Sequence, residues 1–179
     1  MAMFKKLIRF TGRHADIMQK YCREKGSEQD ISFVVSNNTG EMKNIYIFDN
    51  RVHIYLVGGM LGIIYKKQSP IDKSTDTISS IMPEILDKQR QNLERMYHHM
   101  VLSEDNNLTA DEKIKKAFSI NKADEEWDSE QKRLENYVRG GLEIIDEIFS
   151  KCQSYEDICN SMFELAKMVK IDNPQEGEN

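Results

Sequence analysis

The sequence predicts an α+β fold: an N-terminal helix, a four-stranded antiparallel β-meander and a C-terminal antiparallel helical bundle. Three observations favour this class. Residues 31–67 are rich in β-branched and aromatic side chains and are interrupted by Asn, Asp and Gly. Residues 78–169 repeat apolar side chains at helical spacing. The polar stretch 68–77, which contains Pro70, separates the two regions.

The predicted boundary also divides the charge. Residues 1–74, expected to form the basic helix and the meander, carry a net charge of +5, whereas the remaining residues carry −10. We expect residues 75–171 to form an acidic helical region packed on or beside the first part, and residues 172–179 to form a disordered tail. A chain of 179 residues can bury all of this in one compact unit.

The N-terminal residues are expected to form a basic amphipathic helix with an apolar stripe from Phe4 to Cys22 and a stop at Lys25-Gly26, and Gly12 would produce either a kink or two short helices. Candidates for a basic patch are Lys5, Lys6, Arg9, Arg13, Lys66 and Lys67. Such a patch can contact nucleic acid. Docking of the basic helix on the acidic helices of the same molecule explains the asymmetry equally well, and a pI near 5.5 works against phosphate-backbone binding as the main function.

Residues 31–36 alternate as a half-buried strand, and residues 37–40 (NNTG) form a strong turn signal. Two apolar runs follow, separated by Asp49-Asn50, a pair typical of hairpin turns. The glycine cluster at 58–62 is interpreted as a bulged turn before a fourth strand, since no helix start or GxxxxGK[ST] pattern marks a phosphate loop.

A sheet face is the best candidate for a ligand site. His53 and Tyr55 would lie on one face of the second hairpin strand, with Tyr46 on the paired strand and Arg51 at the turn. A histidine among tyrosines could act as a general base or as a stacking platform for bases. Packing beneath a helix, with the polar tips in water, is the alternative.

Four segments are expected to build the helical region. A first helix begins near Pro83, and Thr109 to Glu112 form a capping box that opens a short helix ending near Ile120. The longest helix covers roughly residues 122–152 and repeats apolar side chains near heptad spacing. Ser154 caps a last helix whose apolar stripe consists of Tyr155, Ile158 or Cys159, Met162, Ala166 and Val169.

Gly140-Gly141 lies within the longest helix, where each glycine costs about 0.8–1 kcal/mol relative to alanine. Close packing, a hinge or a ligand contact would explain the pair. We name Trp127, Val138, Gly140 and Gly141 as candidates for helix packing. The run from Tyr137 to Glu143 (YVRGGLE) resembles helices of small proteins encoded beside bacterial DNA-modification and defence systems, but so short a match assigns no family.

No catalytic or metal motif is evident in the sequence. Glu94 and His98 share a helix face but lack further ligands, so neither a metal nor another cofactor is predicted. Three cysteines without CxxC spacing and the lack of a signal peptide indicate the cytoplasm. The uncharged run 54–65 is too short to span a bilayer, and no membrane contact is expected.

Two functional hypotheses follow. The first is a non-catalytic cytoplasmic interaction protein, that is an adaptor, a chaperone-like factor or a regulatory subunit. It would act through its helical region on another protein or on itself, as a homo-oligomer; ten methionines suit an adaptable surface. The alternative is an accessory nucleic-acid-binding protein of a bacterial DNA-modification or defence system. An enzyme is the less favoured class.

Overall fold

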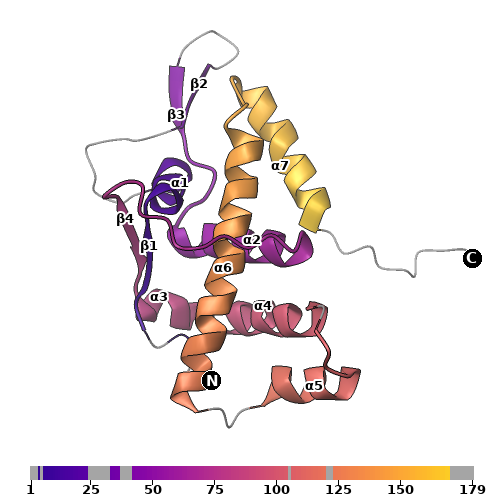
Figure 1. Ribbon diagram of the computed structural model, residues 1–179. Coiled ribbons are helices and arrows are strands. Elements are labelled where there is room, and N and C mark those ends of the chain that lie inside the picture. Colours follow the sequence, from indigo (N-terminus) through magenta and orange to yellow (C-terminus); the bar gives the residue numbers. More distant parts are fainter. Residues whose placement is uncertain are drawn as a thin grey trace, which may run out of the picture.

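The computed structural model describes Phe4 and residues 6–23, 33–36, 42–104, 106–119 and 123–169. In this part of the chain a long helix, α6, stands at the centre; α1 and α7 lie on opposite sides of it, and α2 crosses it (Figure 1). The elements are β1 (Ile8–Thr11), α1 (Arg13–Tyr21), β2 (Phe33–Ser36), β3 (Met42–Ile45), α2 (Arg51–Ile64), β4 (Ile78–Ile81), α3 (Pro83–Lys88), α4 (Arg90–Ser103), α5 (Ala110–Phe118), α6 (Asp124–Phe149) and α7 (Tyr155–Val169).

The predicted four-stranded meander is wrong, because the described part of the chain is mostly helical. Its four short strands form two separate antiparallel pairs, β1 with β4 and β2 with β3. In the first pair Ile8 lies opposite Ile81 and Thr11 opposite Ile78. The β1–β4 pair therefore joins a segment predicted in the N-terminal helix to residues that follow the predicted polar hinge 68–77 and precede the helix expected near Pro83. The predicted turn at residues 37–40 lies outside the described residues.

The most apolar stretch of the chain forms α2 instead of two strands and a glycine turn. Asn50 begins this helix: its Oδ1 accepts a hydrogen bond from the backbone N–H of His53 at 3.1 Å, an N-cap contact. Val52, Ile54, Tyr55, Leu61 and Ile63 are all buried. A helix covered on most sides has apolar residues around its whole circumference, so a helical period gives no signal in its sequence.

The predicted N-terminal helix is only partly correct. Residues 8–11 form β1, and the helix begins at Arg13 after Gly12, whose φ of 61° is a left-handed value that favours glycine. Asp72 fills the space beside Gly12, where an added Cβ would lie 2.2 Å from its Oδ2. The break at Gly12 therefore turns the chain from the strand into α1.

α2 crosses α6 with the two backbones in contact. A Cβ added at Gly141 would lie 1.7 Å from the carbonyl oxygen of Gly58, and one added at Gly62 would lie 1.9 Å from that of Tyr137. A Cβ added at Gly140 would likewise lie 2.1 Å from the carbonyl oxygen of Lys67. α6 stays helical through both glycines, so the pair neither breaks nor hinges the helix.

The remaining helices begin close to where the sequence predicts. Pro83 opens α3, although a break at Gln89 separates α3 from α4. The capping box of α5 is confirmed: the Thr109 side chain accepts from the N–H of Glu112, whose carboxylate accepts from the N–H of Thr109. On α6, Trp127 is buried edge-on against Tyr97 of α4 at 5.6 Å between ring centres, and Val138 is fully buried.

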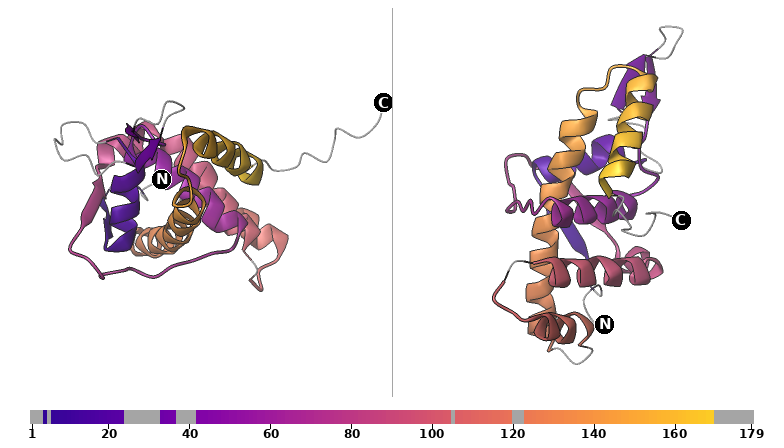
Figure 2. Two further views of the ribbon diagram at one scale, coloured as in Figure 1. Left: turned by 90° about the horizontal axis from the view of Figure 1, so that it is seen from above. Right: turned by 90° about the vertical axis from the view of Figure 1, so that its right-hand side faces the viewer.

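A connecting segment, residues 66–77, joins α2 to β4 and crosses the face of α6 opposite α2. It runs across the front of α6 in Figure 1 and forms the long link seen from above in Figure 2. We call it the strap. Among the described helices, none is both long and apolar enough to cross a membrane.

Candidate functional site

The predicted ligand residues do not converge on one face. His53 and Tyr55 lie on α2, where two positions apart means nearly opposite sides of the helix. Tyr55 is fully buried and packs edge-on against Phe10, and its hydroxyl has no hydrogen-bond partner among the described residues. Arg51 donates to the carbonyl oxygen of Ser80, while Tyr46 precedes the helix in an irregular segment. The sheet-face site was an outcome of the wrong strand assignment.

The predicted basic patch is largely engaged within the molecule. Lys6 pairs with Asp128 at 2.6 Å, Arg13 with Glu143 at 2.8 Å, and Lys67 with Glu147 at 2.8 Å, so all three acidic partners belong to α6. Arg9 is exposed on β1, and Lys66 is exposed at the end of α2. Lys5 lies outside the described residues. These pairs make the basic N-terminal region a docking surface for α6.

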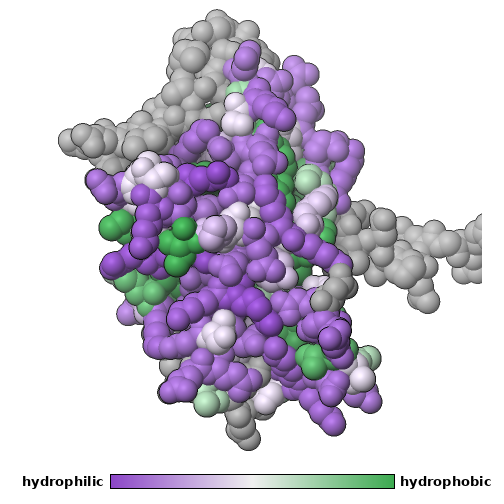
Figure 3. Space-filling view, viewed as in Figure 1, coloured by the Kyte–Doolittle hydropathy of each residue, from purple (hydrophilic) through white to green (hydrophobic). Residues whose placement is uncertain are grey.

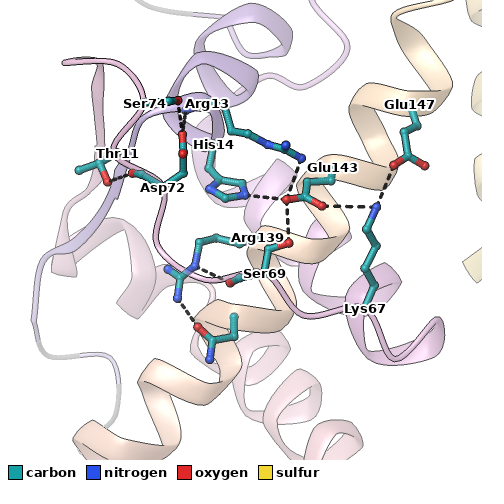
Figure 4. Close-up of polar contacts among 11 residues, drawn as sticks. Thr11, Arg13, His14, Lys67, Ser69, Asp72, Ser74, Arg139, Glu143 and Glu147 are labelled. Carbon is teal, nitrogen blue, oxygen red and sulfur yellow. Dashed lines mark hydrogen bonds and ion pairs between the residues drawn. The ribbon is translucent and has the colours of Figure 1, made fainter.

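Glu143 lies at the centre of this contact (Figure 4). Its Oε1 atom accepts from Ser69 Oγ at 2.7 Å and from His14 Nε2 at 3.2 Å, and it pairs with Arg13 at 2.8 Å. Its Oε2 lies 3.4 Å from the ammonium group of Lys67. One carboxylate therefore ties α1 and the strap to α6.

The titration behaviour of the two central groups follows from this geometry. Burial alone would raise the pKa of Glu143, but hydrogen bonds from Ser69 and His14 and the charges of Arg13 and Lys67 lower that pKa below its ordinary value. Burial lowers the pKa of His14, and the bond to Glu143 opposes this shift only in part. The pKa of His14 therefore lies below that of a free imidazole, and its Nε2 faces the carboxylate as the hydrogen-bond donor.

Further polar contacts fasten the strap on both sides of Glu143. Asp72 accepts from the N–H of Arg13 at 2.6 Å, and its carbonyl oxygen accepts from the hydroxyl of Thr11 at 2.6 Å. Arg139 of α6 is 4% exposed and donates to the carbonyl oxygen of Ser69 at 3.0 Å. A buried arginine held to a backbone oxygen serves to fix a chain position rather than to await a ligand.

The cluster has the residue types of a hydrolase but not their arrangement. In a Ser–His–acid triad the histidine lies between the hydroxyl and the carboxylate. Here Ser69 and His14 both contact Glu143, and Ser69 donates its proton to that carboxylate. The imidazole is therefore not placed to take the proton of the hydroxyl, as a triad requires. Among the described residues, no three His, Cys, Asp or Glu side chains are placed to hold a metal ion.

A groove of about 550 Å³ runs beside the cluster between α1 and α6. Its charged lining is mixed and mostly acidic, with Arg13 and Lys20 beside Asp16, Glu143, Asp146 and Glu147. Lys20 and Tyr21 both reach Asp146, at 3.0 and 2.7 Å. Arg13 pairs with Glu143 and Lys20 with Asp146, so both basic side chains of the lining are already engaged within the molecule.

Apolar side chains without cover gather instead on α7. Tyr155 is 54% exposed, Met162 47% and Phe163 62%, and Cys159 and Ala166 are also exposed. We call these five residues the α7 stripe. The helix lies at the edge of the molecule in two views, with one side free of other described elements (Figures 1 and 2).

Other exposed apolar residues are more scattered. Figure 3 shows a narrow apolar strip between α6 and α7, and separate patches at the left edge, over β1 and β4, and at the lower right, near α5. On α5, Ile114 and Phe118 are exposed, and the Phe118 ring lies 4.3 Å from that of His98. His98, a residue weighed as a metal ligand, thus packs on an aromatic ring.

Sequence reasoning did not identify Glu143 or His14. Neither residue forms a motif with its neighbours in sequence, and the two are joined only by the packing of α1 on α6. A weak signal was present, since Glu143 is an acidic residue directly after the apolar positions 140–142 of a helix. The α7 stripe, in contrast, contains four of the positions that the sequence predicts on one helix face.

No family model, curated protein or solved structure matches this chain.

Proposed function

We propose that this protein is a non-catalytic interaction protein, that is an adaptor, a chaperone-like factor or a regulatory subunit, and that it acts through its helical region. The observation that supports this proposal is the α7 stripe. Its five side chains expose an apolar surface along a helix whose other side is anchored to the core by Ile158 and Leu165. An exposed apolar face of this kind marks a protein-contact site more often than a catalytic one.

The polar cluster around Glu143 supports the same proposal because its side chains are already engaged with one another. Its carboxylate already accepts from or pairs with Arg13, His14, Lys67 and Ser69. Side chains committed to one another hold α1 and the strap in place. The cluster is then part of the scaffold that presents α7, and not the centre of a reaction.

The test compares two surface variants of the full chain. Met162→Glu/Phe163→Glu introduces charge into the α7 stripe, and Ile114→Glu/Phe118→Glu introduces the same charge into the exposed residues of α5. Both variants alter side chains that are 47% or more exposed, so circular dichroism should report an unchanged fold. The matched pair separates loss of an α7 contact from a general effect of added acidic residues.

We expect wild type and the α5 variant to form the same complexes, and the α7 variant to lose them. Light scattering of the purified chain, at low and high salt, detects self-association. Quantitative affinity purification from the native cells detects other proteins. Apolar association persists at high salt, whereas binding to phosphate weakens steeply. The proposal fails if the purified chain stays monomeric and the wild type and the α7 variant recover the same proteins.

A further inference from the structure

The α7 stripe has the spacing of a coiled-coil seam. Tyr155, Cys159, Met162 and Ala166 follow one another at intervals of four, three and four residues. This repeat averages 3.5 residues per turn and keeps the side chains on one line along the helix, where they fit the spaces of a second helix. Phe163 lies next to this line. The stripe is therefore shaped for a helix and not for a flat or irregular surface.

α7 has more apolar surface than its own molecule covers. Ile158 and Leu165 are buried toward the core, while Met162 and Ala166, about one-fifth of a turn further around the helix, face out. The apolar arc thus continues without a polar border from the covered side to the exposed side. Polar positions return only beyond Phe163, at Glu156 and Lys167. A helix packed on the exposed part would complete the burial of this arc.

The charges of α7 fit a copy of the same helix running in the opposite direction. Glu156 and Asp157 lie in the first turn of α7, and Lys167 lies in the last turn, where it also pairs with Glu164 of its own helix at 2.8 Å. Antiparallel pairing places the acidic turn of each helix beside the lysine-bearing turn of the other and opposes the two helix dipoles. A parallel pair would bring both acidic turns together. An isologous contact of this kind closes on itself as a dimer.

We propose that α7 pairs antiparallel with α7 of a second copy of this chain, through the α7 stripe. This inference rests on the proposed function and names its partner. In an antiparallel coiled coil each a position of one helix faces a d position of the other. Cys159 of each copy then lies opposite Met162 of the other, and Tyr155 opposite Ala166. Glu156 and Lys167 of different copies lie on the same flank of the pair.

The size of the contact sets the expected strength. A helix of 15 residues is about 22 Å long, and a pair of this length buries less than the roughly 800 Å² per partner of a standard interface. We therefore expect a reversible dimer with a dissociation constant on the order of micromolar to tens of micromolar. Its mass should rise with concentration from that of one chain toward that of two.

The first experiment measures this mass by sedimentation equilibrium of the full chain under reducing conditions. Met162→Glu is expected to weaken dimerisation at least tenfold. Phe118→Glu, on α5, should leave it unchanged. A wild-type chain that remains monomeric through the millimolar range overturns the inference, as does a dimer that Met162→Glu leaves intact.

The second experiment tests the direction of the helices by disulfide formation. Cys159 is exposed, whereas Cys22 and Cys152 are buried. Wild type is mixed with a size-tagged Cys159→Ser/Met162→Cys variant and oxidised mildly. Antiparallel pairing yields a covalent dimer of the two different chains, while neither chain alone is linked. Parallel pairing instead yields covalent dimers of two wild-type chains or of two variant chains, because identical positions then face each other. This result overturns the proposed arrangement.

Failure of this inference is distinguishable from failure of the proposed function. If the purified chain is monomeric but Met162→Glu/Phe163→Glu removes other proteins recovered from the cell, the second copy is excluded and the interaction role stands. If neither a dimer nor an α7-dependent complex exists, both are excluded.

Discussion

α2 and α7 are both rich in apolar residues and both pack near α6, yet α2 is largely buried whereas α7 is largely exposed. α2 is covered on most of its circumference, and three of its glycines lie at contacts with α4 or α6. α7 has large side chains on its exposed face and buries only the side that carries Ile158 and Leu165. The contrast teaches that small residues let a helix enter the core, whereas bulky residues on a second face leave surface for another molecule.

The largest effect is expected from filling the α2–α6 crossing. Gly141→Leu would place a side chain where the carbonyl oxygen of Gly58 lies, so the helices must separate. We expect a loss of more than about 4 kcal/mol in the free energy of unfolding, measured by urea denaturation. Gly58→Ala is the matched control. Its Cβ would lie 3.4 Å from the nearest atom, an ordinary contact, and stability should stay equal or rise by up to about 1 kcal/mol.

The second-largest effect is expected on the buried side of α7, and the exposed side should show almost none. Leu165→Ala removes a side chain that is 8% exposed and is expected to cost about 2–3 kcal/mol of unfolding free energy. Met162→Ala, on the exposed side, should change it by less than about 0.5 kcal/mol in dilute monomer. Equal losses for the two variants in thermal and urea denaturation would show that the α7 stripe is part of the core.

A smaller effect tests the start of α2. Asn50→Ala removes the acceptor for the N–H of His53 and should cost about 1 kcal/mol. Asn50→Asp keeps an oxygen acceptor and also places a negative charge at the helix N-terminus, so stability should be retained. If alanine were as stable as wild type in urea denaturation, the cap would contribute nothing to the choice of helix over hairpin.

The smallest expected effect is a change of slope with pH. The pKa of His14 is lowered in the folded protein, so the unfolded chain binds a proton first as pH falls through its ordinary value near 6.5. Stability should therefore decrease between pH 7 and pH 5.5, and His14→Gln should flatten this dependence. Glu143, whose pKa is also lowered, adds a loss at more acidic pH. An unchanged slope in His14→Gln would assign the dependence to other groups.

The sequence predicted the helices with clear ends and one-sided patterns. α5 has its capping box, and α6 and α7 lie within a few residues of the predicted bounds. It failed at α2, where an all-round apolar run has no period and Asp49-Asn50 was interpreted as a turn although Asn50 is a helix cap. The length of the run, which exceeds most strands, was the signal that favoured a helix.

The candidate sites also differ in how far they could be predicted, because one depends on local spacing and the other on long-range contacts. The α7 stripe depends on spacing within one helix, so its positions are present in the sequence pattern, although not their exposure. The Glu143 cluster depends on contacts between distant segments, since His14 and Ser69 lie 129 and 74 residues from Glu143 in the sequence. No local pattern contains such a contact. Trp127 and Val138, predicted on the helix-packing face, are buried and belong to the core of a single chain.

The crossing of α2 and α6 also has a consequence for synthesis of the protein. Gly58 and Gly141 are separated by roughly 80 residues, which a ribosome adds in about 4 to 16 seconds at 5–20 residues per second. During this interval the most apolar segment of the nascent chain has emerged and lacks its partner helix. Aggregation and chaperone capture should therefore concentrate on α2 until the middle of α6 leaves the exit tunnel.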